Sequence, residues 1–374
     1  MKTSMKIVAM LMAAMMLACL FTACGKDTNS GDKTFLLGCT GPLTGDASSY
    51  GISVKNGAQL AVDEVNAAGG VNGIKFTFDM KDDKATAEDA ATGYDALMDA
   101  GMQISLGSVT SGSCESFASK SVADNLFFMT PSASAANVIA NRPNAFRVCF
   151  GDPDQGTLAA KELSAKYEKI GAIYDNSDPY SKGIFEAFDA EMKTLNKEFS
   201  TQTFDQVTKM DFSQVEALKD CDVIVLPMYY QEGSLICKAA TAKGCKADLV
   251  GTDGFDGIAD LIDSKTVTNK VKYITPFDAD SKDATVSKFV TAYKAKYNET
   301  PDQFAADAYD AVYAIYNAMK AAGVNDVTIS PSDLCEKVKA AITADGFTLT
   351  GATGTMSWDA SGACKKELQF KDVL

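Results

Sequence analysis

The stretch Gly107-Ser-Val-Thr-Ser-Gly-Ser-Cys-Glu115 joins an apolar run, residues 103–106, to a helical pattern that begins at Ser116. We predict a strand before this stretch and a helix after it. The stretch carries four hydroxyl side chains and two glycines, and Glu115 suits a first helical turn. Hydroxyls and free backbone N–H groups at a helix N-terminus favour an anion. Alternatively, the hydroxyls only cap the helix, because serine and threonine favour caps for local reasons.

The same alternation of apolar runs and amphipathic stretches continues along the chain from Lys33. Short apolar runs predict strands at 35–39, 75–80, 103–106, 126–129, 171–174, 221–226, 248–251 and 271–275. Longer amphipathic stretches predict helices at 53–67, 87–100, 155–169, 182–195, 284–297 and 302–322. This order predicts an α/β fold with doubly wound parallel sheets that helices cover on both faces.

Polar and aromatic loops follow seven of these predicted strands, and they carry hydroxyls, carboxylates and rings. In open α/β sheets, ligands bind outside the carboxyl ends of the strands. Such loops suit a small zwitterion with an apolar part. One loop of this kind is ordinary turn chemistry, whereas seven of them form a pattern.

The strand–helix series is doubled, which agrees with a length of 374 residues and two domains. One series ends near Phe150 and another begins near Gly171, so the polar stretch 151–155 is the candidate boundary. The helices at 284–297 and 302–322 resemble those of the first series, and we expect them to return to its sheet.

The composition excludes several classes of function. A net charge of −14 argues against nucleic acid, which requires a basic face. The chain has no histidine, so Ser-His-Asp and Cys-His catalysis and imidazole metal sites are absent. The cysteines beyond Cys24 are scattered without a C-x-x-C, which disfavours zinc. Several lie in or beside apolar runs, as Cys221 does, and we interpret those as small buried hydrophobic residues.

The first residues predict a leader. Lys2 and Lys6 precede an apolar run, residues 7–20, and small residues follow. This order and length predict a secretory signal peptide over residues 1–23.

The end of this leader, Phe21-Thr-Ala-Cys-Gly25, resembles the lipobox of bacterial lipoproteins, whose cysteine becomes the acylated first residue. Phe21 departs from the usual aliphatic residue. We expect Cys24 to carry a lipid anchor and residues 24–32 to form a flexible tether. The alternative is a cleaved, freely secreted protein in which Cys24 is incidental.

The chain resembles the branched-chain amino-acid type of substrate-binding lipoprotein of ATP-driven (ABC) importers, the periplasmic binding protein type I family. The resemblance covers nearly all of the mature chain. Its marks are Gly41–Gly45, Tyr50-Gly51, Asn56–Ala58, Asn66–Gly73, Gly107–Ser111, Thr130–Ser134, Phe146-Arg147, Asp154–Gly156 and Ala305–Tyr309. Each mark is weak alone, but their order and spacing are specific.

The resemblance implies two α/β lobes that three crossovers join and that close on a ligand. We expect the crossovers near Gly151, Asp278 and Ala352. The first lobe then comprises residues 33–150 and 279–351, and the second comprises 151–278 and 352–374.

The resemblance also implies the ligand contacts. The ligand carboxylate meets Ser111 and Ser134, and its ammonium meets the Ser132 carbonyl and Asp253. The expected walls of the site are Tyr50, Val109, Tyr180, Tyr230 and Phe277, with Tyr229 as an alternative to Tyr230.

Two departures from the family pattern leave the choice of amino acid open. The family often has glutamate where Asp253 stands, and Pro179 precedes Tyr180. Asp253 could also be a simple turn residue, and Tyr180 and Tyr230 could be amphipathic surface rings.

The function that the resemblance implies is capture of an amino acid, branched-chain or related, outside the cytoplasm and its delivery to an ABC permease. We expect a monomer with no catalytic residues, metal or cofactor. The alternatives are a ligand sensor with a separate signalling partner and an enzyme. The first loop lacks the spacing of a nucleotide site, and no pair of carboxylates is specific, which disfavours an enzyme.

Overall fold

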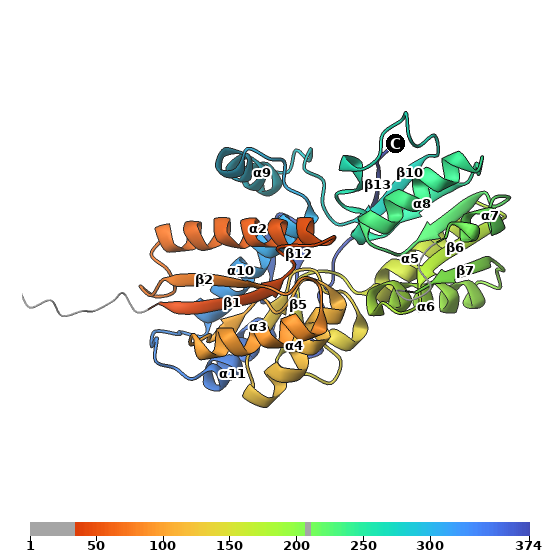
Figure 1. The fold of residues 1–374 in the computed structure, drawn as a ribbon. Coiled ribbons are helices and arrows are strands. Elements are labelled where there is room, and N and C mark those ends of the chain that lie inside the picture. Colours follow the sequence, from red (N-terminus) through yellow and green to blue (C-terminus); the bar gives the residue numbers. More distant parts are fainter. Residues whose placement is uncertain (1–33, 206–210) are drawn as a thin grey trace, which may run out of the picture. The chain divides into compact units, whose positions relative to one another are not determined.

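The computed structural model describes residues 34–205 and 211–374, which form two helix-covered sheets and one short hairpin (Figure 1). The predicted signal peptide, Cys24 and the tether lie outside these residues. No helix in the described ranges combines the length and the apolar character needed to cross a membrane.

The first sheet has the strand order β2-β1-β3-β4-β5, and its strands are parallel. They are β1 (Phe35–Gly41), β2 (Phe76–Asp82), β3 (Ile104–Ser105), β4 (Phe128–Thr130) and β5 (Ala145–Arg147). The helices around this sheet are α2 (Ser48–Ala67), α3 (Ala87–Asp99), α4 (Ser111–Asp124), α9 (Ala284–Tyr297), α10 (Gln303–Ala321) and α11 (Pro331–Ile342), with the short η1 (Ala136–Val138). We call this sheet and its helices the first lobe.

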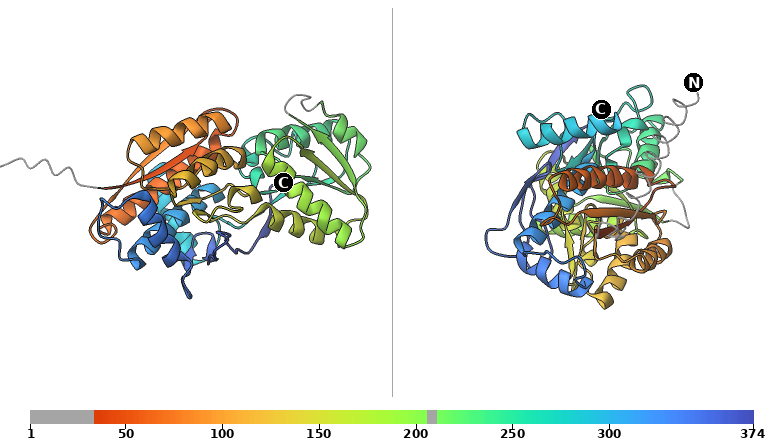
Figure 2. Two further views of the ribbon diagram at one scale, coloured as in Figure 1. Left: turned by 90° about the horizontal axis from the view of Figure 1, so that it is seen from below. Right: turned by 90° about the vertical axis from the view of Figure 1, so that its left-hand side faces the viewer.

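Helices cover both faces of the first sheet (Figure 2) because successive side chains of a strand point to opposite faces. Leu37 of β1 belongs to the same buried cluster as Val54 of α2. Its neighbour Leu36 packs against the cluster that contains Leu97 of α3. The late helix α10 packs along α2, so the chain returns to this lobe after visiting the second one.

The second sheet has the order β13-β10-β9-β8-β6-β7, in which only β13 is antiparallel to its neighbour. Its strands are β6 (Ile170–Asp175), β7 (Ser200–Phe204), β8 (Val223–Leu226), β9 (Asp248–Gly251), β10 (Val271–Thr275) and β13 (Gln369–Asp372). Its helices are α5 (Asp152–Ser164), α6 (Pro179–Thr194), α7 (Ser213–Ala217) and α8 (Tyr230–Ala242), with the short η2 (Asp253–Phe255) and η3 (Ile258–Asp260). This sheet and its helices are the second lobe.

Without β13, the two sheets have the same topology. In each sheet the first strand of the lobe lies in the interior, and its neighbours are the second and third strands. Connections therefore leave in opposite directions after β1 and β3, and again after β6 and β8. Ligands of doubly wound folds bind at such switch points. The predicted fold class, two doubly wound α/β lobes, is confirmed.

The chain passes between the lobes three times. It leaves β5 for α5, returns from β10 to α9, and finally runs from the hairpin of β11 (Leu349–Gly351) and β12 (Gly354–Met356) to β13. The Trp358 indole N–H donates to the Arg147 carbonyl at 2.7 Å, so the third passage runs beside β5 before it joins the second sheet. The boundaries at Gly151, Asp278 and Ala352 stay a proposal.

The eight cysteines from Cys39 to Cys364 are free thiols. All are buried except Cys221, which is half-buried, so the interpretation as small core residues suits the others better than Cys221.

Candidate ligand-binding site

The loop from β3 to α4 has the conformation that its sequence requires. Gly107 has a φ of +67°, and a Cβ there would lie 2.7 Å from the Phe128 ring, so only glycine fits. Thr110 is the extended N-cap residue of α4, and Ser111 begins the helix. The free N–H groups and the positive end of the helix dipole therefore lie at the switch point of the first sheet.

Hydroxyl groups from two loops of the first lobe line a small cavity there. Val109, Thr110, Ser111 and Ser132 all contribute to its wall. The Ser132 hydroxyl donates to the Val109 carbonyl at 2.7 Å, and Ser111 Oγ accepts from the Ala135 N–H at 3.2 Å. Thr110 Oγ1 is buried and has no hydrogen-bond partner among the described residues. Thr110, one of the residues that line the cavity, thus has a hydroxyl whose hydrogen-bonding capacity the described residues leave unused.

Ser134 lies behind this wall. Its carbonyl accepts from the Asp152 N–H at 3.0 Å and from the Arg147 guanidinium. Burial raises the pKa of Asp152 well above its ordinary value, and the Ser134 hydroxyl opposes that rise. Ser134 is therefore tied to the first crossover, and its predicted contact with the ligand stays a prediction.

The second lobe contributes a carboxylate, Asp253, which follows β9 and is 4% exposed. Its Oδ1 accepts three hydrogen bonds: from the Tyr180 hydroxyl at 2.7 Å, the Gln155 amide at 2.9 Å and the Gly254 N–H at 3.0 Å. None of these three bonds uses Oδ2. A simple turn residue would be solvated, so its burial and bonding favour a specific role for this carboxylate.

Burial raises the pKa of Asp253 to about 6, and the bonds from Tyr180, Gln155 and Gly254 oppose this rise. The carboxylate is therefore mostly ionised at pH 7. A ligand cation beside it would lower its pKa further, because an opposite charge favours the ionised form.

Four aromatic rings form the apolar wall, two from each lobe. Tyr180 and Tyr229 stack with centroids 5.0 Å apart and an interplanar angle of 5°. Tyr50 of α2 and Phe304 of α10 lie 4.5 Å apart. All four line the cavity, so an apolar group there would lie between rings from both lobes.

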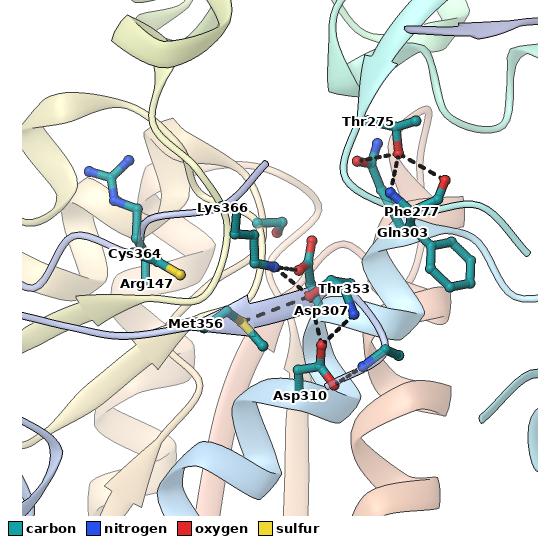
Figure 3. Close-up of polar contacts among 12 residues, drawn as sticks. Arg147, Thr275, Phe277, Gln303, Asp307, Asp310, Thr353, Met356, Cys364 and Lys366 are labelled. Atoms are coloured by element: carbon teal, nitrogen blue, oxygen red, sulfur yellow. Dashed lines mark hydrogen bonds and ion pairs between the residues drawn. The ribbon is translucent and has the colours of Figure 1, made fainter. Parts of the chain in front are cut away.

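Tyr230 and Phe277 are buried but do not line this cavity. The Tyr230 hydroxyl donates to the Asp46 carbonyl at 2.8 Å, and its ring meets the Tyr50 ring edge-on. Phe277 lies beside Thr275 in Figure 3 and packs against Phe289. Tyr229, the alternative to Tyr230, takes the position on the wall.

The two lobes contact each other around the site. The Tyr50 hydroxyl donates to the Gly254 carbonyl and accepts from the Tyr230 N–H at 3.0 Å. The cavity measures about 20 Å³, which is room for about one water molecule. A larger ligand can therefore bind only if the surrounding residues move apart.

A larger cavity of about 650 Å³ lies elsewhere, between residues 136–143, the start of α5 and residues 360–364. Its lining contains none of the predicted ligand residues. The small cavity is the better candidate because donors, a carboxylate and rings converge on it from both lobes. Within residues 34–205 and 211–374, no cluster of acidic, cysteine or histidine side chains could hold a metal ion.

The sequence predictions did not include Thr110, Gln155 and Phe304. Thr110 lies inside the hydroxyl-rich stretch, and Gln155 lies in the family mark Asp154–Gly156, so both had a sequence signal. Phe304 had none, because a ring near the start of an amphipathic helix indicates only burial.

Three comparisons relate the chain to known proteins. A family model described as periplasmic binding protein matches residues 35–363. The Leu/Ile/Val-binding protein BraC3 of Rhizobium johnstonii is 28% identical over 329 residues, which is 86% of this chain and 88% of that protein.

Two solved structures have the same fold. The substrate-binding protein LivJ of a Streptococcus pneumoniae branched-chain amino acid transporter, in complex with isoleucine, has a TM-score of 0.80 and 28% identity, over 90% of this chain and 95% of that one. A solute-binding protein of an R. palustris ABC transporter, in complex with benzoate, has a TM-score of 0.80 at 18% identity, over 91% and 93% of the chains, which is a likeness of fold alone. The match of the family model over most of the chain, with two doubly wound lobes around one site, shows that the chain belongs to the periplasmic binding protein family.

Proposed function

We propose that this protein is an extracytoplasmic solute-binding protein that captures an amino acid, branched-chain or related, between its lobes and delivers it to an ABC importer permease. One observation carries the proposal. A cavity has hydroxyls and a helix N-terminus on its first-lobe side and the buried Asp253 carboxylate on its second-lobe side.

This arrangement matches the charges of an amino acid. The carboxylate of the ligand would accept bonds from Ser111 and its neighbours, and the ammonium would pair with Asp253. Hydrogen bonds in which one partner is ionised are about twice as strong as neutral ones, so both ends contribute to orientation. The apolar side chain of the ligand would lie between the rings of Tyr180, Tyr229 and Phe304.

A protein of the same fold binds benzoate, so we compare an aromatic carboxylate with an amino acid as the ligand of this site. Benzoate would satisfy the hydroxyl side of the site, but it would bring a second anion to the cavity, so Asp253 would have to stay buried without a cation or take up a proton. A buried charge without a partner is costly. Asp253 therefore favours a ligand that carries an ammonium.

A thermal-shift screen tests this proposal. Leucine, isoleucine, valine and the other common amino acids should raise the melting temperature, because a ligand that binds only the folded state stabilises it by mass action. Benzoate and a des-amino analogue of leucine should give a much smaller shift. A larger shift with benzoate than with every amino acid would contradict the proposed ligand class.

Binding in a cavity of this size requires the lobes to separate and close, and the proposed crossovers are the hinges. Small-angle scattering should show a larger radius of gyration without ligand than with a saturating amino acid. Equal radii would contradict the hinge model.

We also propose that Cys24 carries the lipid anchor that holds the protein at the membrane. Labelling with a fatty acid should mark the wild type and fail in Cys24→Ser. Undiminished label in the variant would disprove the anchor.

Import and sensing make the same binding predictions, so a separate measurement distinguishes them. Uptake of labelled leucine should fall in cells that lack the protein and return with its gene. Unchanged uptake together with tight binding would favour the sensor.

A further inference from the structure

Two glutamines from different lobes hold Asp253, and neither was predicted as a site residue. Gln155 of α5 is 0% exposed and Gln303 of α10 is 1% exposed. We propose that they are positioning residues with separate tasks: Gln155 keeps the Asp253 carboxylate charged and oriented for the ligand, and Gln303 latches Asp253 to the first lobe when the lobes close. This inference rests on the proposed function, in which Asp253 binds the ammonium.

Two side-chain atoms of Gln155 form hydrogen bonds to Asp253. Its Nε2 donates to Asp253 Oδ1 at 2.9 Å, and its Oε1 accepts from the Asp253 N–H at 3.0 Å. A carboxamide donates and accepts at its tip without carrying a charge, so neither an ionised glutamate nor an aliphatic residue can replace these two bonds. Both residues belong to the second lobe, so this contact does not depend on closure.

The Gln155 bonds also orient the carboxylate. Gln155, Tyr180 and the Gly254 N–H all bond to Oδ1, which fixes the plane of the carboxyl group. The other oxygen, Oδ2, takes no part in these bonds. Donors that bind the ionised form also stabilise the charge that the ligand cation requires.

Gln303 makes a different contact, across the lobes. It is the first residue of α10, which packs along α2 in the first lobe. Its Nε2 donates to the Asp253 carbonyl at 2.8 Å, and its backbone N–H donates to Asp256 at 3.0 Å. Figure 3 shows its Oε1 at the Thr275 hydroxyl, 3.2 Å away, at the end of β10.

Gln303 thus connects the start of α10 to Asp253, the proposed ligand residue. It also connects α10 to β10, the strand that leads into the second crossover. Among the described residues, the Gln303 side chain bonds only to the Asp253 backbone carbonyl and the Thr275 hydroxyl, so it does not act on the charge of the Asp253 side chain. Opening of the lobes would break the bonds to Asp253 and Asp256, whereas it would leave those of Gln155 intact.

The charge state of Asp253 depends on the titratable groups and hydrogen bonds around it. The titratable groups around it are Tyr180 of α6, Asp152 of α5, Asp307 of α10, Tyr50 of α2, Tyr229 before α8 and Cys149 before α5. Burial and Asp307 raise its pKa, and the bonds from Tyr180, Gln155 and Gly254 lower it. Loss of the Gln155 bond therefore moves the pKa of Asp253 upward.

The matched variants Gln155→Met and Gln303→Met test the two tasks, because methionine keeps the length of the side chain and removes its polar groups. Leucine affinity is measured by calorimetry from pH 5 to pH 8, and dissociation by stopped flow. Wild-type affinity should fall about tenfold per pH unit below the pKa of ligand-free Asp253.

In Gln155→Met the midpoint of this pH profile should move up by about one unit or more. Loss of one hydrogen bond to the ionised carboxylate raises its pKa by about that amount. In Gln303→Met the midpoint should stay, and dissociation should become about tenfold faster. Gln155→Leu is the second variant, and its midpoint should also rise, although the leucine side chain adds no charge of its own. It replaces Gln155→Met in the test if that variant does not fold.

An unmoved midpoint in folded Gln155 variants would overturn the separate tasks of Gln155 and Gln303. Equal shifts in both methionine variants would do the same. In either case, leucine binding by the wild type would leave the proposed function standing. A wild type that binds no amino acid at any pH would overturn the proposed function and this inference with it.

Discussion

The two sheets have the same topology, but the polar groups that the two lobes bring to the cavity have opposite chemistry. At the switch point of the first sheet, between β1 and β3, neutral hydroxyls and a helix N-terminus line the cavity, and Thr110 Oγ1 is buried without a partner among the described residues. In the second lobe the polar group is a carboxylate, Asp253, and three donors already bind one of its oxygens. The first-lobe side has a hydroxyl with unused hydrogen-bonding capacity. The second-lobe side has a carboxylate that is charged and already accepts three hydrogen bonds.

This difference follows from the cost of burial. A buried neutral hydroxyl without a partner costs a few kcal/mol at most, so the fold tolerates it. A buried carboxylate costs far more unless donors surround it, and Asp253 has three such donors from its own lobe. We therefore expect the second-lobe side to set whether a ligand binds, and the first-lobe side to adjust how tightly it binds.

The strongest test of this comparison is Asp253→Asn. The variant keeps the shape of the side chain and removes the charge that faces the ammonium. Loss of one partner of a buried ion pair costs roughly 3–5 kcal/mol, so affinity for leucine should fall by a factor of about 150 to about 5,000. Calorimetry measures the loss, and Asp260→Asn, an exposed change in the same lobe, is the control that should bind as wild type does.

The same variant should be more stable without ligand. The pKa of Asp253 is raised above its ordinary value of 3.8 to about 6, so the folded state loses stability as pH rises from about 4 to about 6. A shift of about two units corresponds to about 3 kcal/mol, and this net shift already includes the opposing hydrogen bonds. At pH 8 ligand-free Asp253→Asn should melt above wild type. A lower melting point would mean that the carboxylate serves stability rather than binding.

Most of the features in this comparison could be predicted from the sequence. The fold class follows from the alternation of apolar runs and helices, and Ser111 and Asp253 follow from a strand-end pattern together with the family resemblance. Both line the same cavity. The three-residue strand β5 and the half-exposed edge strand β7 were missed, since neither carries a long apolar run.

The orientation of rings was harder to predict, because it depends on where a helix starts. Tyr229 is the N-cap residue of α8 and faces the cavity, whereas Tyr230 begins the helix and faces Tyr50. Adjacent tyrosines give no local sign of which is the cap. Phe304 lines the site only because α10 returns from far along the chain, which is a tertiary fact.

A middle-sized effect should come from Ser111→Ala, on the other side of the comparison. The change removes a hydroxyl from the carboxylate side, and a bond to a charged group contributes roughly 1.5–3 kcal/mol, so affinity should fall about 10- to 100-fold. Ser119→Ala, on the exposed face of the same helix, is the matched control and should have no effect.

Ligand analogues separate the two ends. The amide of leucine should bind wild type poorly and lose little more in Ser111→Ala, because the charge that Ser111 serves is already gone. The des-amino analogue should lose little more in Asp253→Asn. If both variants bind leucine as wild type does, the site lies elsewhere in the molecule.

The smallest and most discriminating effect should come from Thr110→Val. Valine has nearly the shape of threonine and removes a hydroxyl that is buried without a partner. Without ligand the variant should gain up to about 1 kcal/mol of stability, because an unsatisfied group is removed. With leucine it should lose about fivefold in affinity, because one hydrogen-bond donor to the ligand is removed. Thr130→Val is the matched control, because Thr130 Oγ1 is buried, donates to the Ser108 carbonyl at 2.8 Å and accepts from the Ala133 N–H at 3.0 Å. That control should lose stability whether or not ligand is present. If Thr110→Val also loses stability without ligand, the hydroxyl has a structural partner. The contrast between an unbonded hydroxyl on the first-lobe side and a carboxylate held by three donors on the second-lobe side then does not hold.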